Sequence, residues 1–506
     1  MASVNTVFAW RLTVDWNRDG VYTDESAYLV NATGRQSIVA AGDGLTTGRG
    51  TVDQATFVLD NANNRFGFFG STLVADIGNG NALRVPVTFE VAKGGVYYPV
   101  FAGFVKGISQ SAWQASQINT VTLDCRSIDD ALLQDKRSTP DSDFAGWANT
   151  PQLEGEIITD LLTFAGYTDG VHFRSAASYP ATATIDKGLF RLPWVWLDDE
   201  SVLEEIWAIA GACGGIFYTD ASGVFHYEAL DNWLFTGAAV ALTQYTAIAP
   251  IYDDRELFSG AIVEMNERRA GAFEVVWEPD APPIVPPNTE NYKYVVSARL
   301  DSPLLVYSNT TFNAVTHGGA DITGDINVEI EVFAQRVLIK FGNESSYAAI
   351  IRNLQIVGQP AVGARGEETG LSSSDAFWTG RASRIKSVRG NPYIQTDSQA
   401  RSLVRFLRDR FERPRLRWQV SGTEVPELGM GQRVTINETG LGMSAARDGH
   451  IIGRQWSVGA GGYVEILDVI DRATLFPFID ASPAGYFIIG TNKLGTSDAL
   501  RGRVFY

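Results

Sequence analysis

Residues 15–26, DWNRDGVYTDES, hold the spacing in this chain that best matches a metal-binding pattern. Asp15, Asn17 and Asp19 stand at alternate positions before a glycine, as in calcium loops of the D-x-[DN]-x-[DN]-G type, where oxygen ligands converge around a sharp turn. An EF-hand has a bidentate Glu at the twelfth position, which is Ser26 here, so a neighbouring carboxylate has to substitute. The expected calcium ligands are Asp15, Asn17, Asp19, Val21 and Asp24, with Glu25 as the alternative to Asp24. The same residues also fit a polar hairpin turn that holds no ion.

No arrangement of catalytic side chains is evident elsewhere. The chain has four histidines, far apart in the sequence: His172, His226, His317 and His450. They show no H-E-x-x-H or Cys/His spacing, and a G-x-S-x-G motif is absent. The acidic pairs Asp198-Asp199 and Asp253-Asp254 are more typical of solvated turns than of general acid and base pairs. We therefore expect no catalytic residues and no enzymatic activity.

The segment GLGMSA at 440–445 has glycines spaced as in a dinucleotide-binding loop. Such a loop opens a helix whose N–H groups point at the pyrophosphate. Here the flanking sequences, RVTI before the glycines and GHIIGRQW after them, alternate like strands. We expect a hairpin connection at this point and no nucleotide cofactor.

Positive charge is concentrated in residues 381–417, which carry 11 Lys/Arg against three Asp/Glu, a local charge of +8 in a chain whose net charge is −17. Contact with nucleic acid is one interpretation of this segment. A solvated helix face, or pairing with an acidic surface on a neighbouring copy, explains it better. The acidic balance of the rest of the chain disfavours non-specific binding to DNA or to anionic lipid surfaces.

The composition indicates a multidomain globular protein that is mainly β. The 506 residues allow three or four domains, and 45% hydrophobic with 20% charged residues are ordinary globular values. Fifty Gly with 27 Phe, 18 Tyr and 12 Trp favour short strands separated by turns. Cys125 and Cys213 are too few for a disulfide framework, so we expect folding in a reducing cytosol. No stretch of eighteen apolar residues occurs, and the first residues do not resemble a signal peptide, so no membrane span is expected.

Two structural domains are predicted before residue 281. Short alternating runs broken by Gly and Asn predict a first β-barrel-like domain at 1–137. An α+β middle domain at 138–280 is predicted from a helix over 151–165, a second helix that Ser201 caps, and a hairpin whose turn is Asp220–Gly223.

The second half is predicted to contain three further parts. The proline-rich segment 279–287 predicts an extended spacer, and a β-sandwich-like insert follows at 288–375. A helix over 398–412, capped by Thr396 or Asp397, leads a second β-barrel-like domain at 376–475, and a C-terminal extension occupies 476–506.

The two barrel-like domains share a weak internal repeat. The first contains GNALRVPVTFE, FAGFVK and VTLDCRSID, and the last contains GMGQRVTINE, IIGRQW and EILDVID in the same order. The matched positions are Gly80 with Gly429, Arg84-Val85 with Arg433-Val434, Gly103 with Gly453, and Leu123-Asp124 with Leu467-Asp468. Chance similarity between two β meanders is the alternative to duplication.

These segments together resemble one protein family. VDWNRDGVYTDE, FVLDNANNRFG, LRVPVTFEV, FAGFVKGIS and VTLDCRSIDDALL resemble the opening domain of siphophage tail hub proteins, also called baseplate hub or minor tail proteins. ESVLEEIWAIAGACGGIFYTDASGVFHYE is similar to their middle domain, and SQARSLVRFLRDRFERPRLRWQV with GRQWSVGAGGYVEILDVID is similar to their second barrel region. The final YFIIGTNKLGTSDALRGRVFY is similar to their terminal segment, and the insert at 288–375 is the part matched least.

The resemblance implies a structural protein at the distal end of a phage tail. Members of the family are homotrimers whose two related barrels per chain give six similar positions to a six-fold tube. The implied partners are the distal tail protein or tail tube, the tape-measure protein, and receptor-binding or fibre proteins, with DNA passing transiently along a negative wall that it does not bind. The implied location is the virion tail tip, after a stage in the host cytoplasm.

A calcium-dependent protein that binds or cleaves carbohydrate is the alternative from another functional class. It is motivated by the Asp15–Asp19 loop, the aromatic residues and the sandwich-like insert. Aromatic faces stack on sugars, but they also fill β cores.

Overall fold

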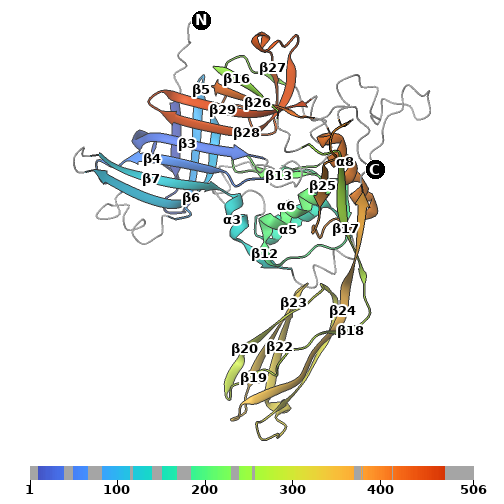
Figure 1. The fold of residues 1–506 in the computed structure, drawn as a ribbon. Helices are drawn as coiled ribbons and strands as arrows, with labels where there is room; N and C mark the ends of the chain where they lie inside the picture. Colours follow the sequence, from blue (N-terminus) through green and yellow to red (C-terminus); the bar gives the residue numbers. More distant parts are fainter. Residues whose placement is uncertain are drawn as a thin grey trace.

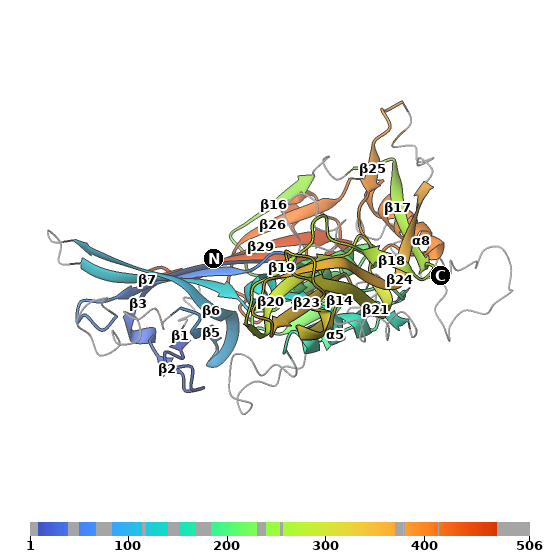
Figure 2. The same cartoon turned by 90° about the horizontal axis from the view of Figure 1, so that it is seen from below.

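The computed structural model describes residues 9–38, 50–66, 83–113, 118–139, 151–167, 184–229, 239–252, 257–369, 378, 380–412 and 414–472. One large twisted sheet forms the upper body in Figure 1, a helical layer lies beneath it, and an elongated β insert extends away from both. The view from below in Figure 2 shows the insert crossing beneath the helical layer. The predicted C-terminal extension, 476–506, lies outside the described residues.

The large sheet has 13 strands, and its main path runs β16-β26-β29-β28-β3-β4-β7-β6-β5-β1-β2, with β27 beside β28 and β15 beside β27. Its strands from the first part of the chain are β1 (Ala9–Val14), β2 (Thr23–Asp24), β3 (Leu29–Ser37), β4 (Gln54–Asp60), β5 (Pro86–Lys93), β6 (Val96–Trp113) and β7 (Ile118–Ser127). Those from the later part are β15 (Val240–Ala241), β16 (Ala247–Tyr252), β26 (Leu416–Thr423), β27 (Arg433–Ile436), β28 (Arg447–Gly459) and β29 (Gly462–Asp471).

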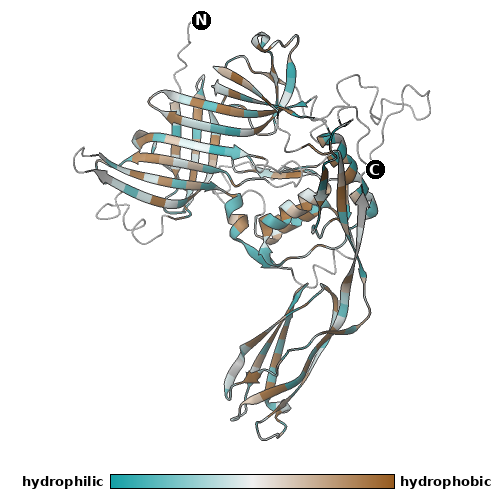
Figure 3. Ribbon diagram, in the orientation of Figure 1, coloured by the Kyte–Doolittle hydropathy of each residue, from teal (hydrophilic) through white to brown (hydrophobic). Residues whose placement is uncertain are grey.

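This sheet confirms a mainly β, multidomain protein but differs from two separate barrels. Because β3 pairs with β28, the strands of the two predicted barrel domains continue into each other instead of closing, and among the described strands the path has two free ends, β16 and β2. Hydropathy alternates along these strands in Figure 3, as expected where one face of a sheet packs on a core and the other faces solvent.

The predicted helices form where apolar periodicity and caps agree. They are α5 (Glu154–Phe164), α6 (Val202–Cys213) and α8 (Asp397–Phe411), with a short α3 (Asp129–Gln134) before them. The Ser201 hydroxyl accepts the backbone N–H of Glu204, and the Thr396 hydroxyl accepts that of Gln399, so both are N-caps. The predicted hairpin is also present, as β13 (Ile216–Thr219) and β14 (Phe225–Glu228), because the Asp220 carboxylate accepts two N–H groups within the turn.

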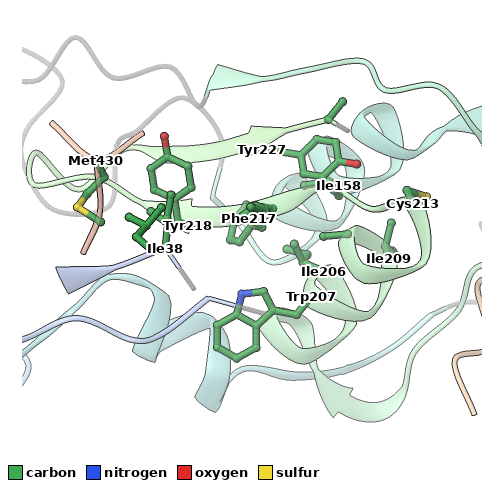
Figure 4. Packing of buried hydrophobic residues seen from close by; sticks show 14 of the residues in the cluster. Ile38, Ile158, Ile206, Trp207, Ile209, Cys213, Phe217, Tyr218, Tyr227 and Met430 are labelled. Carbon is green, nitrogen blue, oxygen red and sulfur yellow. The ribbon is translucent and has the colours of Figure 1, made fainter. Parts of the chain in front are cut away.

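One apolar core joins the helical layer to the second part of the sheet. It contains α6 residues such as Ile206 and Ile209, hairpin residues such as Phe217, and sheet residues such as Trp418 and Ile451. Figure 4 shows the α6 side chains packing against Phe217 and Tyr227. Short strands complete this layer: β8 (Lys136–Ser138), β9 (Gln152–Leu153), β10 (Thr184–Ile185), β11 (Arg191–Leu192) and β12 (Asp198–Ser201). The middle domain is therefore α+β, as predicted, but it shares its core with the second barrel region.

The insert is a sandwich that begins earlier than residue 288. Its strands are β17 (Gly260–Ala270), β18 (Glu274–Trp277), β19 (Ile284–Val285), β20 (Thr289–Arg299), β21 (Leu304–Val315), β22 (Ile326–Val332), β23 (Arg336–Asn343), β24 (Ala349–Thr369) and β25 (Ile385–Val388). The proline-rich segment is not a spacer, because Ile284 and Val285 pair with Ile350 and Ala349, and Val285 is buried in the insert core. The prolines flank these two pairing residues, where a missing N–H costs the ladder nothing.

Two buried carboxylates lie where the first sheet strands meet α3. Asp53 accepts the Gln36 side-chain amide at 3.1 Å and the Ser37 backbone N–H at 3.2 Å, and the Ser127 hydroxyl donates to Asp129. Burial raises the pKa of Asp53 well above its ordinary value, and repulsion from Asp129 adds to that rise. Burial also raises the pKa of Asp129, to about 7.

We expect the free energy of unfolding to fall as the pH rises from about 4 to above 7. A carboxyl whose pKa is raised in the folded state binds its proton more tightly there than in the unfolded chain, so stability is lost as the pH passes from the unfolded to the folded pKa. Asp129→Asn should reduce this slope by on the order of 2 kcal/mol between pH 5 and pH 8, and the contribution of Asp53, whose pKa is raised mainly by its own burial, should remain. Urea unfolding at both pH values measures it, with the exposed Asp124→Asn on the preceding strand β7 as control. Equal slopes in all three proteins would contradict the expectation.

Candidate functional site: the seam between two repeated sheet blocks

The seam is the strand pair that joins the early and late parts of the large sheet. Residues 32–37 of β3 lie antiparallel to residues 453–458 of β28, with Gly453 opposite Ser37 and Val458 opposite Ala32. The backbone N–H of Ile38 adds a bond to the carbonyl of Ile452 at 3.1 Å. In Figure 1 the two strands lie next to each other at the centre of the sheet, although more than 400 residues separate them in the chain.

Trp456 carries the side-chain contact of the seam. Its indole belongs to a late strand but is buried in the core of the early strands, stacked on Phe89 with ring centroids 5.1 Å apart and 6.3 Å from Phe57. Opposite it on β3 is Gly34, where a Cβ would come within 2.3 Å of the indole ring. The indole therefore occupies space that any larger residue at position 34 would take.

The strands on the two sides of the seam form the same arrangement. In the first block, the order is β3-β4-β7-β6-β5, and in the second block it is β16-β26-β29-β28-β27. Each neighbouring pair within a block is antiparallel, and the strands follow one another along the chain in the same sequence in both blocks. The weak repeat in the sequence thus corresponds to a repeated five-strand fold.

A β-bulge fixes the register of the repeat. On β6 the register shifts between Val105 and Gly107, which lies opposite Asp124, and on β28 it shifts between Ile451 and Gly453, which lies opposite Asp468. The match of Leu123-Asp124 with Leu467-Asp468 is confirmed. The match of Gly103 with Gly453 is wrong by four residues, because Gly107 holds the equivalent place beyond the bulge.

The match of Arg84-Val85 with Arg433-Val434 is wrong by two residues. The N–H of Arg84 donates to the carbonyl of Val105, and the N–H of Gly431 donates to that of Ile451, so Arg84 corresponds to Gly431. Both have a positive φ, 63° and 73°. Gly80, the remaining matched position of the first block, lies outside the described residues.

The open face of the sheet, opposite the first-block core, is mostly polar, with Val58, Val464 and Ile466 among its apolar residues, and its charges are close to neutral. Exposed or half-buried hydroxyl and amide side chains run across it: Asn31, Thr33, Gln54, Thr56, Ser109, Ser111, Thr120, Thr122, Gln455 and Ser457. Its charged residues balance: Asp60, Asp124, Asp468, Arg35, Arg126 and Arg417. Burial raises the pKa of Asp468, while the Gln419 amide and the two arginines near it, Arg35 and Arg417, act in the opposite direction.

The expected calcium loop folds as a turn in which its carboxylates accept hydrogen bonds from backbone N–H groups of the same loop. The Asp15 carboxylate accepts the N–H groups of Asp19 and Gly20, at 3.2 and 2.9 Å, and the Asp19 carboxylate accepts that of Val21. Glu25 is buried and paired with Arg65 and Trp16, so of the two substitute ligands only Asp24 is left. In the described part of the chain, no three His, Cys, Asp or Glu side chains converge as a metal site does. Calcium binding by Asp15, Asn17, Asp19, Val21 and Asp24 stays a prediction.

The other residues singled out in the sequence have structural surroundings. His226 pairs with Asp220 at 3.1 Å, and burial lowers the pKa of His450 to about 4. Asp198 pairs with Arg299 and Arg336 of the insert. His172 and the pair Asp253-Asp254 lie outside the described residues. Around His226, His450 and Asp198, the described contacts do not place a nucleophile next to a base.

Two structural facts bear on the remaining sequence expectations. The GLGMSA segment connects β27 to β28 as a hairpin through a short 3-10 helix, η4 (Thr439–Leu441).

In the basic segment, Arg410 and Arg415 are buried, and burial lowers the pKa of Arg410 to about 9. The segment is therefore in part interior, and not a continuous solvated patch.

An open groove of about 760 Å³ lies beside the free edge strand β16. Tyr252, Leu416 and Trp418 give it an apolar wall, and the Arg447–Asp471 ion pair at 2.9 Å gives it a charged one. The groove is therefore lined by both apolar and charged side chains.

Comparison with known proteins gives structural neighbours only. No family model matches the chain, and no curated protein matches its sequence. The structural neighbours include tail proteins and a component of a type VI secretion system. The tail protein from Neisseria meningitidis MC58 is 10% identical, with 93% of this chain and 98% of that chain covered and a TM-score of 0.46. The 43 kDa tail protein of prophage MuSo2 from Shewanella oneidensis is 10% identical, with 93% of this chain and 98% of that chain covered and a TM-score of 0.47. Prophage tail protein gp18 from Listeria monocytogenes EGD-e is 9% identical, with 91% of this chain and 94% of that chain covered and a TM-score of 0.40. No described helix is long and apolar enough to cross a membrane.

We expect Trp456→Ala to lower the free energy of unfolding by about 3–5 kcal/mol, because it empties an aromatic site in a dry core. Gly34→Val should cost a similar amount by pushing the indole out. Val464→Ala, a half-exposed site on the next strand, is the control and should change stability by less than about 1 kcal/mol. Denaturant unfolding measures all three, and a Trp456→Ala loss no larger than the control's would show that the seam does not depend on the indole.

If the Asp15 loop holds calcium, chelation should lower the melting temperature of the native chain and leave Asp19→Ala unaffected. Ligand at a hundred times its Kd stabilises a fold by about 2.7 kcal/mol, which is a measurable shift. Asp60→Ala, a surface carboxylate of the same block, should retain the native response. The same melting temperature with and without chelator would leave only the self-closed turn.

Proposed function

We propose that this chain is the structural tail hub of a siphophage, a homotrimer that closes the distal end of the tail tube, adapts it to a three-fold tip and opens for DNA passage. The observation that carries the proposal is the repeated five-strand block. A six-fold tube requires six similar surfaces around its end, and three copies of a chain with two equivalent blocks supply six. The resemblance of most of residues 7–506 to tail hub proteins supports the same assignment.

The seam gives the two blocks a fixed relation. Because β3 and β28 are hydrogen-bonded neighbours and Trp456 is buried in the first-block core, the blocks cannot turn independently. In the trimer they would lie about one sixth of a turn apart around the axis. A rigid pair of this kind is what a symmetry adaptor needs.

The open face of the sheet is the surface that we assign to the channel. Its hydroxyl and amide side chains can be wetted without a strong attraction to phosphate, and its balanced charges give little net field. DNA would then pass because the wall is hydrated and neutral. This replaces the mechanism of like-charge repulsion that the acidic composition had suggested.

The remaining parts serve attachment in this proposal. The partners would be the distal tail protein or tail tube, the tape-measure protein and receptor-binding or fibre proteins, at the virion tail tip. The insert, which extends away from the sheet in Figure 1, is the part best placed to meet a peripheral partner. We assign no enzymatic role to the chain.

The concentrated protein should have a native mass of three times 55.1 kDa, and the assembled tail should hold three copies. Native mass spectrometry and electron microscopy of tails check these two expectations. Incubation with host-wall glycans should release no reducing ends. A different copy number in the tail, or glycan cleavage abolished by a single carboxylate substitution, would contradict the proposal.

A further inference from the structure

The groove beside β16 lies where four strands of the second block begin or end together. Strand β16 ends at Tyr252, which pairs with Leu416 at the start of β26, and β29 ends at Asp471, which pairs near the start of β28. The hairpin loop between β27 and β28 supplies another wall, from Leu441 to Ala446. The groove is therefore at one mouth of the block, between strand ends and a loop.

Five exposed residues that line the groove are apolar. Tyr252 is 65% exposed and Leu441 is 43% exposed, and Pro250, Ala445 and Ala446 are exposed as well. A concave site of about 760 Å³ with apolar walls and a few charged groups is typical of a cleft that binds a ligand or a peptide. Its apolar surface gains free energy when another apolar group covers it.

The chain itself continues from the groove. Arg472, the residue after the end of β29, is one of the residues that line it. The sequence then reads ATLFPFIDASPAGYFIIG over residues 473–490, and its first apolar run is LFPFI at 475–479. This run follows Arg472 by three to seven positions, so at no more than about 3.6 Å per residue it lies within about 25 Å of the groove.

We propose that residues 475–479 bind in the groove of their own chain. The inference goes beyond the hub assignment and does not depend on it. A leucine, two phenylalanines and an isoleucine match a site whose exposed residues are apolar, and their binding would remove both surfaces from water. The bound run would cover Tyr252 and Leu441.

Tethering favours this occupant over a separate molecule. A segment joined to its site by a short linker has an effective concentration in the millimolar range, which a free partner has to reach in solution. Pro477 adds to the advantage, because its ring fixes its own φ and biases Phe476 toward extended backbone. Less conformational entropy is then lost on binding.

The charge around the groove also fits the segment. Burial lowers the pKa of His450 to about 4, and repulsion from Arg472, Arg433 and Arg410 adds to that shift. These arginines therefore give a positive field at this end of the block. Over residues 473–492 the segment has a single charged residue, Asp480, directly after the apolar run. A carboxylate at that position is attracted by the field.

Thiol protection tests the proposal in the full chain. Ala445→Cys places a thiol in the groove wall, and Val464→Cys places one at an exposed site on β29. Mass spectrometry of the intact protein should show that a maleimide modifies the groove thiol at least tenfold more slowly. Cys125 and Cys213 are buried and should stay unreactive in both variants. Equal rates at the two introduced thiols would overturn the proposal, and this comparison needs no change in the segment.

Substitutions in the segment identify the residues that protect the thiol. Adding Phe476→Asp and Phe478→Asp should speed modification of the Ala445→Cys thiol at least tenfold. The matched control is Phe487→Asp with Ile488→Asp, which puts the same two changes in the second apolar run and should leave the thiol protected. If the control pair exposes the thiol as much as the first pair does, or if neither pair exposes it, the assignment to residues 475–479 is wrong.

Dilution distinguishes the chain's own segment from that of a neighbouring copy. A contact within one chain gives the same protection over about a hundredfold dilution, because its effective concentration is set by the linker. Protection that disappears on dilution would show that the segment is exchanged between copies, and the proposal would then fail.

Discussion

The structure depends on one contact: the indole of Trp456, which lies over Gly34 within the core of the first block. Strand pairing alone is a narrow connection between two halves of a sheet, since main-chain bonds exchange with water at little net gain. Burial of a large aromatic group from one half in the dry core of the other adds the non-directional stabilisation that makes the halves a single cooperative unit. The glycine is what lets the two backbones come close enough for that burial.

Local features were predictable from the sequence, and the long-range joint was not. Ser201 and Thr396 could be placed as caps because their helices show apolar periodicity next to a capping residue. The hairpin turn at Asp220 was predictable because Asp is a residue type that accepts hydrogen bonds within its own turn. No sequence pattern around Gly34 or Trp456 indicates that each residue pairs with a strand more than 400 residues away. The repeat was found from its order, but matching glycine to glycine missed the bulge, which inserts a residue without leaving a sequence signature. Of the predicted calcium ligands, the sequence could show the spacing, but it could not show that Glu25 is already paired with Arg65.

The two blocks have diverged in their interiors while keeping their ladders. Where the first block has Ile108, the second has the buried Arg454, paired with Glu465 and Tyr463 and donating to the carbonyl of Leu428. A buried ion pair contributes little net stability, but it fixes geometry, because breaking it leaves an uncompensated charge. Here it holds the connection from β26 to β27, and Glu427 in that connection pairs with Lys93 of β5 at 2.6 Å. The second block thus has a polar interior that orients a loop toward the first block.

The two long strands β17 and β24 connect the insert rigidly to the body, so a force on the insert is transmitted to the body. They run antiparallel from the insert into the body, and Asn266 of β17 is bonded to the carbonyls of Ile394 and Asn391 just ahead of α8. At the opposite corner, Asp198 holds Arg299 and Arg336 of the insert in ion pairs. A hydrogen-bonded ribbon resists shear along its length, whereas ion pairs whose arginines are partly exposed yield more easily. A sideways load on the insert would therefore break the ion pairs of Asp198 first. The remaining force would act as a torque on α8 and on the core that α8 shares with the sheet.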